Sequence, residues 1–179
     1  MVTIAIIDDE ENILNSLRRL LRKQGWEVLT FEDPQTALAE LRFAEVDIII
    51  SDYRLPDMNG VELLNLLKTI VSDALRILLS GQADLAGVMG AINQAEVYRF
   101  ISKPWTDSEL IMTLENALKF NELEKENRRL ATLVRDQEIT LRKQLEELQR
   151  LERESPGITQ VEWNDDGSID LLDEEDSPS

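Results

Sequence analysis

Four short apolar stretches of this chain each end in polar or charged residues, and this pattern constrains the fold more than any other feature. In an open parallel α/β sheet, the carboxyl ends of the strands share one edge, and ligands bind there. We therefore expect three carboxylates, a hydroxyl and an ammonium group to line one crevice. The stretches are Thr3–Ile7 before Asp8 and Asp9, Val46–Ser51 before Asp52, Ile77–Leu79 before Ser80, and Arg99–Ser102 before Lys103.

These side chains suit one kind of chemistry. Clustered carboxylates repel one another unless a hard cation joins them, and Mg²⁺ prefers oxygen ligands. A carboxylate beside a divalent ion, a lysine and a hydroxyl suits the reversible phosphorylation of an aspartate. The chain has no histidine and no cysteine, which excludes Ser-His-Asp catalysis, imidazole-zinc hydrolysis and disulfides. A phosphohistidine donor would therefore belong to another protein.

The first 118 residues alternate strand-like and helix-like stretches. Five such repeats predict an α/β fold with a five-stranded, doubly wound parallel sheet. The stretch Val46–Ser51 is nearly all apolar, as a central parallel strand should be. The predicted strands are Thr3–Ile7, Glu27–Phe31, Val46–Ser51, Arg76–Leu79 and Val97–Ser102, and the predicted helices after the first are Thr36–Phe43, Val61–Ile70 and Asp84–Ala95.

The last helix begins with a clear signal and has no early end. Thr106 and Glu109 fit a capping box, and no Pro or Gly occurs between Trp105 and Ser155. We predict one helix over Asp107–Arg153, which would be ~70 Å long at a rise of ~1.5 Å per residue. Its first third is expected to pack on the sheet.

A seven-residue repeat follows in this helix and indicates a coiled coil. A lone Asn127 at an a position favours a parallel homodimer in register, whereas Gln137 and Gln144 at d weaken the seam. A helix that packs on a partner protein or back on its own domain remains the alternative. The apolar seam residues, with Asn127, are Phe120, Leu123, Leu130, Val134, Leu141, Leu148 and Leu151.

Three regions are predicted along the chain. Residues 1–118 form the α/β domain, residues 119–153 the coiled-coil extension, and residues 154–179 an acidic tail. In the tail, Ile158–Trp163 and Ser168–Leu172 flank a turn-like Asn-Asp-Asp-Gly sequence and resemble a β-hairpin. The final residues after Leu172 read as a disordered acidic end.

Charge and hydropathy exclude several classes of function. The formal net charge is −17, and residues 154–179 hold nine acidic and no basic side chains. A basic face for nucleic acid is missing, because the basic residues of the long helix are interleaved with acids. No apolar run approaches the ~18 residues of a membrane span, and the amino end lacks the pattern of a signal peptide. We expect a cytoplasmic protein with no direct nucleic-acid or membrane partner.

Five motifs, in order and each at the expected strand end, identify the resemblance. Residues 1–118 resemble the receiver domain of two-component response regulators, which has a flavodoxin-like fold. The motifs are Ile6-Ile7-Asp8-Asp9-Glu10, Ser51-Asp52-Tyr53, Leu55-Pro56-Asp57-Met58-Asn59-Gly60, Leu79-Ser80-Gly81 and Phe100-Ile101-Ser102-Lys103-Pro104.

The resemblance implies a role for each matching residue. Asp52 would be the phosphoacceptor. Asp9, Asp52 and the backbone carbonyl of Arg54 would hold Mg²⁺, with Asp8 acting through water. Lys103 would pair with one phosphoryl oxygen. Ser80 would donate to another, and Phe100 would be the aromatic switch residue. The Lys103-Pro104 peptide is expected to be cis, and Gly60 to be a backbone requirement of its loop.

Each residue also has a plainer interpretation. Asp8 or Asp9 could cap the first helix. Ser80 alone would be a turn residue, Lys103 a surface lysine, and Phe100 on an apolar strand a core residue.

The implied function is a stand-alone phosphoacceptor signalling protein, not an enzyme acting on other substrates. A histidine kinase or phosphotransfer protein would supply the phosphoryl group, and output would pass to an unknown downstream protein. Residues 121–179 show no DNA-binding or catalytic domain. The alternative is a constitutive dimeric adaptor, in which the coiled coil and tail carry the function. An Mg²⁺-dependent phosphatase is disfavoured because Arg54 stands where such enzymes need a second Asp.

Overall fold

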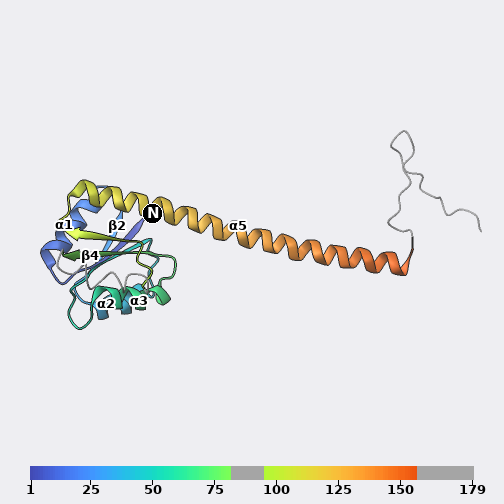
Figure 1. Ribbon diagram of the computed structural model, residues 1–179, viewed down its shortest axis with the longest axis horizontal. Helices are drawn as coiled ribbons and strands as arrows, with labels where there is room; N and C mark the ends of the chain where they lie inside the picture. Colours follow the sequence, from blue (N-terminus) through green and yellow to red (C-terminus); the bar gives the residue numbers. More distant parts are fainter. Residues whose placement is uncertain (82–94, 157–179) are drawn as a thin grey trace, which may run out of the picture. The chain divides into compact units, whose positions relative to one another are not determined.

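The computed structural model of the protein describes residues 1–81 and 95–156. A parallel five-stranded sheet forms its centre, with the strand order β2-β1-β3-β4-β5 (Figure 1). The predicted fold is therefore confirmed. The strands are β1 Thr3–Ile7, β2 Glu27–Phe31, β3 Ile48–Asp52, β4 Leu75–Gly81 and β5 Arg99–Lys103.

Helices cover both faces of this sheet. Side chains of α1 and the first part of α5 share one apolar core with one face, and side chains of α2 and α3 share a second core with the other. Strand β3 lies at the centre, and all five of its residues are buried. The helices are α1 Glu11–Arg22, α2 Pro34–Leu41, α3 Gly60–Ile70 and α5 Asp107–Glu154.

Strands β3, β4 and β5 run further toward the carboxyl edge than the sequence predicted. Asp52 pairs with Leu79, and Lys103 pairs with Gly81, so the ladders include the polar residues themselves. Backbone pairing, not side-chain polarity, decides where a strand ends, and apolar runs therefore miss its carboxyl end. Strands β3 and β5 also begin two residues later than predicted, and only β4 is longer than its apolar run. The helix predicted over Asp84–Ala95 lies outside the described residues, apart from Ala95.

Side-chain caps define the start of three helices. Asp33 accepts a hydrogen bond from the N–H of Thr36 at α2. A capping box formed by Asn59 and Glu62 starts α3, and Thr106 with Glu109 forms the predicted box at α5. Helix α1 differs, because its N-cap is Glu10 and no side chain caps it. Capping by Asp8 or Asp9 is thus wrong, since their carboxylates serve the crevice described below.

Helix α5 is fixed to the amino edge of the sheet by polar contacts that the sequence did not reveal. The buried Asn121 side chain donates to the backbone carbonyl of Asp47 across 3.3 Å. Lys125 Nζ lies 3.0 Å from Asp47 Oδ1, and the other carboxylate oxygen accepts from the N–H of Thr3 at 3.0 Å. These residues belong to one compact unit, Met1–Asn127. The packing of α5 on the sheet therefore continues past Leu118.

The later part of α5, from Arg128, belongs to a second unit. Phe120, expected at the first a position, has its ring 5.2 Å from that of Tyr98.

Pairing of the seam with another helix stays a prediction, and the predicted hairpin and acidic end lie outside the described residues. None of the helices in the described part is long and apolar enough to cross a membrane. Along α5, exposed apolar side chains include Leu123, Leu130, Leu133, Val134, Leu141, Leu145 and Leu148.

Candidate functional site

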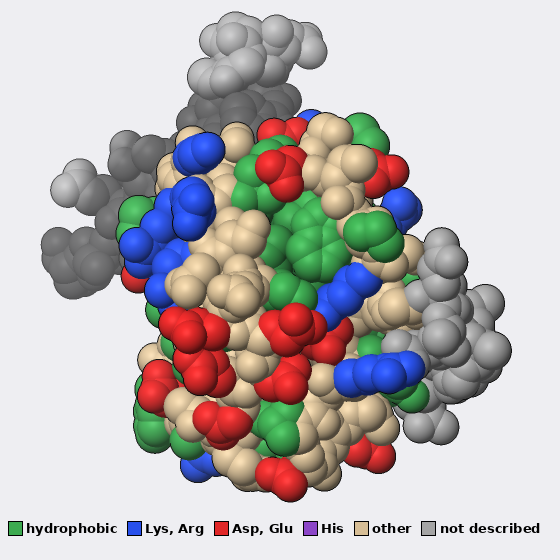
Figure 2. All heavy atoms as spheres, turned by 90° about the vertical axis from the view of Figure 1, so that its left-hand side faces the viewer, with side chains coloured by type: hydrophobic (Ala, Val, Ile, Leu, Met, Phe, Trp, Pro, Cys, Tyr) green, Lys and Arg blue, Asp and Glu red, His purple; other side chains and the backbone are tan. Residues whose placement is uncertain are grey.

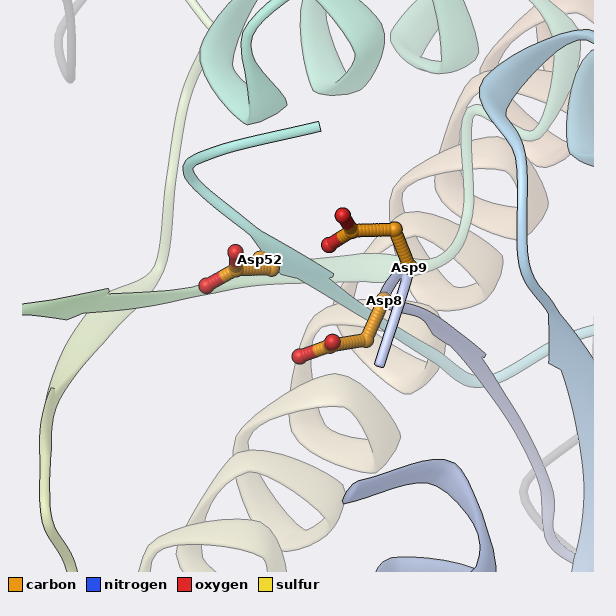
Figure 3. Close-up of side chains that lie close together, drawn as sticks. All are labelled: Asp8, Asp9 and Asp52. Atoms are coloured by element: carbon orange, nitrogen blue, oxygen red, sulfur yellow. The ribbon is translucent and has the colours of Figure 1, made fainter. Parts of the chain in front are cut away.

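Three carboxylates meet at the carboxyl edge of the sheet. Asp8 directly follows β1, Asp9 comes next, and Asp52 ends the neighbouring strand β3 (Figure 3). One oxygen of each carboxylate lies within 4.8 Å of the others. Asp8 is fully buried and Asp52 is nearly so, whereas Asp9 is exposed. The carboxylate crevice predicted from the strand ends is therefore present.

Lys103 completes this crevice from the edge strand β5. Its Nζ lies 2.8 Å from Asp52 Oδ1 and 3.1 Å from Asp8 Oδ2. The ammonium group thus bridges two carboxylates from neighbouring strands β1 and β3. The peptide that follows it, Lys103-Pro104, is cis as predicted. Lys103 is therefore no ordinary surface lysine.

The pKa values in the crevice reflect burial and these contacts. Burial raises the pKa of Asp8, and the N–H of Glu10 at 2.8 Å together with Lys103 only partly offsets this. Burial acts to lower the pKa of Lys103, but its hydrogen bonds to Asp52 and Asp8 outweigh burial and hold that pKa above its ordinary value. Lys103 is therefore charged at neutral pH and serves as a counterion for the carboxylates.

The backbone around Asp52 is tightly packed. The N–H of Arg54 donates to Asp52 Oδ2 at 3.2 Å and orients the carboxylate. At Gly60, an added Cβ would lie 2.0 Å from the carbonyl oxygen of Asp52. Only glycine fits there, which confirms Gly60 as a backbone requirement. The N–H of Gly60 also donates to the carbonyl of Tyr53 across 2.8 Å.

Ser80 and Phe100 lie near this edge in different surroundings. Ser80 is fully buried on β4, and its hydroxyl donates to the carbonyl of Gly81 at 3.2 Å. Phe100 is 39% exposed on the edge strand β5, so the core interpretation of this residue is wrong. The roles of Ser80 and Phe100 in switching stay predictions.

The carboxyl edge of the sheet forms an accessible surface. In Figure 1 the arrow of β4 points toward this edge, and Figure 2 views the molecule from that side. Acidic side chains gather near the centre of the view, with basic side chains beside them and a hydrophobic area above.

The fold and this crevice together define a class of protein: an α/β signalling module with three carboxylates and a lysine at the carboxyl edge. The response regulator receiver domain family matches residues 4–115. This match covers more than half of the chain, and the chain belongs to that family. A receiver domain is a phosphoacceptor signalling module of two-component systems, and the acidic triad is typical of its Mg²⁺ site.

Known relatives agree with this assignment. The chain is 32% identical over 140 residues to the hydrogenase transcriptional regulatory protein HoxA of Cupriavidus necator, covering 78% of this chain and 29% of HoxA. It is 32% identical over 115 residues to the transcriptional regulatory protein FixJ of Rhizobium meliloti, covering 64% of this chain and 56% of FixJ. The chain thus spans less than two thirds of either regulator.

Solved structures show the same fold. The signal receiver domain of an HD domain-containing protein from Pseudomonas fluorescens Pf-5 is 38% identical, with a TM-score of 0.66. The match covers 70% of this chain and 92% of that domain. A structure titled adenylate cyclase from Rhodopirellula baltica has a TM-score of 0.68 at 30% identity, over 73% of this chain and 96% of that one.

Proposed function

We propose that Asp52 accepts a phosphoryl group from the phosphohistidine of a histidine kinase or phosphotransfer protein in the cytoplasm. A carboxylate oxygen of Asp52 would form a bond to phosphorus while the bond to the donor imidazole breaks, and the imidazole nitrogen keeps the electron pair. The observation that carries the proposal is the contact of Asp52 with Lys103 at 2.8 Å beside two further carboxylates. Phosphoryl transfer depends mostly on such positioning and charge neutralisation.

The donor set also fits Mg²⁺. Asp9, Asp52 and the backbone carbonyl of Arg54 would hold the ion, and Asp8 would act through water. Carboxylate and carbonyl oxygens are hard ligands of the kind Mg²⁺ takes, and the three carboxylate oxygens within 4.8 Å are close enough to share it. When bound, the ion offsets the negative charge of the incoming phosphoryl group.

Phosphorylation would then change the contacts of three residues. Lys103 would pair with a phosphoryl oxygen in place of a carboxylate oxygen. The Ser80 hydroxyl would leave the carbonyl of Gly81 and donate to another phosphoryl oxygen, which opens space for Phe100. Two observations support this. The Ser80 hydroxyl bonds only to the carbonyl of the next residue, and the ring of Phe100 is partly exposed on an edge strand. A local charge event would thus bias a two-state element.

The proposed output is a protein–protein interaction through the surface of the receiver and the apolar seam of α5. A parallel homodimer would form along that seam, with Asn127 at an a position in register. The apolar side chains of the seam are about half exposed, for example Leu130 at 45% and Leu141 at 58%. Covering them in a dimer would remove this apolar surface from water.

The test is the intact mass of the protein after incubation with Mg²⁺ and a small acyl-phosphate donor. Wild type is expected to gain one phosphoryl group and Asp52→Asn none. The variant has almost the same shape, so a circular-dichroism spectrum like that of wild type serves as the folding control. An Asp52→Asn protein that still gains the mass would refute the assignment of the site.

A constitutive adaptor is the second candidate, and the exposed apolar side chains of α5 favour it because their exposure needs no phosphoryl group. Truncation separates the two functions. The cut belongs after Asn127, since Asn121 and Lys125 hold the helix to Asp47. Loss of partner binding in the truncated protein, regardless of phosphorylation, would favour the adaptor.

A further inference from the structure

The part of α5 after Asn127 carries one apolar stripe. In the heptad frame, Val134, Leu141 and Leu148 occupy a positions, and Leu130 and Leu151 occupy d positions. The side chains of Leu130, Val134, Leu141 and Leu148 are between 45% and 58% exposed in the single chain. A stripe of this length on a solvated helix indicates a partner helix.

The charges beside this stripe have one sign only. The e and g positions, which flank a and d, are where coiled-coil partners exchange ion pairs and select one another. From residue 128 to residue 154, none of the seven basic residues of α5 occupies e or g. The basic residues Arg128, Arg129, Arg135, Arg142, Lys143, Arg150 and Arg153 occupy b, c and f, whereas Glu138 and Glu152 occupy e and Glu147 and Glu154 occupy g.

A second copy of the chain meets these flanks poorly. In a parallel pair, a g residue faces the e residue five positions later in the other helix. Glu147 would therefore face the second copy's Glu152, twice per dimer. Within its own helix, Glu147 bonds Arg150 at 2.7 Å, but both side chains are more than half exposed. An exposed pair of this kind is weak and screened by salt, so Glu147 keeps its acidic character beside the seam.

We propose that this seam binds a parallel amphipathic helix of another protein, one with Lys or Arg at its e and g positions. The partner would be the downstream protein of the signalling function proposed above. Only this identity of the partner rests on the proposed function. The homodimer is then less stable than the complex with the basic helix, which replaces the second copy on the same seam. Charge complementarity at e and g selects the partner, and apolar contacts at a and d hold it.

A pair of synthetic peptides provides the test. Both carry Leu or Val at a and d and an Asn at the a position that faces Asn127, and they differ only at e and g, which are Lys in one and Glu in the other. Binding to the full-length protein is measured by titration calorimetry at low and high salt. The Lys peptide is expected to bind more than about tenfold tighter at low salt, since several flanking pairs change from repulsive to attractive. Raising the salt should reduce this ratio.

A matched pair of protein variants locates the effect. Glu147→Lys changes a g position, whereas Glu146→Lys makes the same charge change at the neighbouring f position, away from the seam. Glu147→Lys is expected to weaken binding of the Lys peptide several-fold, because like charges would then face each other. The same variant should form a tighter homodimer in sedimentation experiments, because the introduced ammonium group would face Glu152 of the partner subunit. Glu146→Lys should leave both constants near those of wild type.

Two results would overturn the inference. One is equal affinity of the Lys and Glu peptides at low salt, and the other is an equal effect of the two variants. Phosphorylation of Asp52, measured by intact mass on the same samples, reports the receiver function separately. Either of these results together with normal phosphorylation would therefore reject the proposal of a basic partner helix and leave the receiver assignment intact.

Discussion

Replacing Lys103 by Met would leave two carboxylates facing each other at the carboxyl edge of the sheet. The methionine keeps a flexible side chain of similar length but removes the ammonium group that lies 2.8 Å from Asp52 Oδ1 and 3.1 Å from Asp8 Oδ2. Asp8 is fully buried and has no access to solvent for compensation. We therefore predict that Lys103→Met is less stable than wild type at neutral pH in the absence of Mg²⁺.

The size of the effect follows from these distances. At an effective dielectric constant of ~20, the two contacts correspond to Coulomb energies of ~5–6 kcal/mol each. Most of this offsets the cost of burying the charges, and breaking one partner out of a buried pair typically costs ~3–5 kcal/mol. The Lys103 side chain is 22% exposed, so solvent screens part of the interaction. We expect a loss of about 3 kcal/mol in the free energy of unfolding.

The pH dependence of this loss has a definite sign. In wild type the pKa of Lys103 is raised above its ordinary value of 10.5, so the stability that it contributes is present throughout the neutral range and is lost only as pH rises beyond that value. Burial already raises the pKa of Asp8 above 3.8, and Lys103 acts to lower it. Without the lysine, Asp8 should bind a proton at higher pH still. The variant should therefore recover stability relative to wild type as pH falls from neutral toward the range in which Asp8 is protonated.

Urea denaturation at several pH values, with and without Mg²⁺, measures this directly. Mg²⁺ should stabilise the variant more than wild type, because the ion replaces the missing positive charge. The double variant Lys103→Met/Asp52→Asn is the control, and it should recover part of the loss because the charge of Asp52 beside Asp8 is then absent. A single variant as stable as wild type at neutral pH without Mg²⁺ would refute this electrostatic reasoning.

Three further predictions concern other parts of the receiver. Gly60→Ala, whose Cβ would lie 2.0 Å from the carbonyl oxygen of Asp52, should cost ~1–3 kcal/mol in thermal or urea unfolding and should slow acyl-phosphate labelling; normal labelling would contradict it. Asn121→Ala removes a hydrogen bond to Asp47 and should cost ~1 kcal/mol, with faster amide exchange in this turn of α5 as the specific readout. Asp33→Ala removes the N-cap of α2, in which Asp33 accepts a hydrogen bond from the N–H of Thr36. Since this contact lowers the pKa of Asp33, the stability difference from wild type should be complete above pH 3.8 and should vanish as the pH falls below that value, as measured by denaturation.

The inner strands β1, β3 and β4 could be predicted because they are buried on both faces. The largely apolar stretch before Asp52 and the pattern around Thr3–Ile7 leave little choice of structure. The strand ends were less accurate, since β4 runs to Gly81 through ladder pairs that depend on neighbouring strands. Information of that kind lies in the register of the sheet and not in any single stretch of sequence.

The site was predictable to the extent that parallel strands bring their ends together. That rule placed Asp8, Asp52 and Lys103 in one crevice, and the structure confirms it. Whether Phe100 is buried depends on which strand lies at the edge of the sheet, and polarity alone does not reveal this. The contact of Asn121 with Asp47 joins residues 74 positions apart, and no local pattern signals it.

The contacts of Asp47 with Asn121 and Lys125 have a consequence for the exchange of modules between proteins. Receivers joined to different partners would be recombined most naturally where a linker begins, but here the helix is still part of the receiver at Lys125. A chimaera joined after Leu118 would discard Asn121 and Lys125 and leave the amino edge of β3 without its helix contacts. A chimaera joined after Asn127 keeps both residues. If the helix continues without a break across the junction, the rotational phase of the following helix is also preserved. The boundary that matters for recombination is thus set by one aspartate at the far end of the strand that carries Asp52.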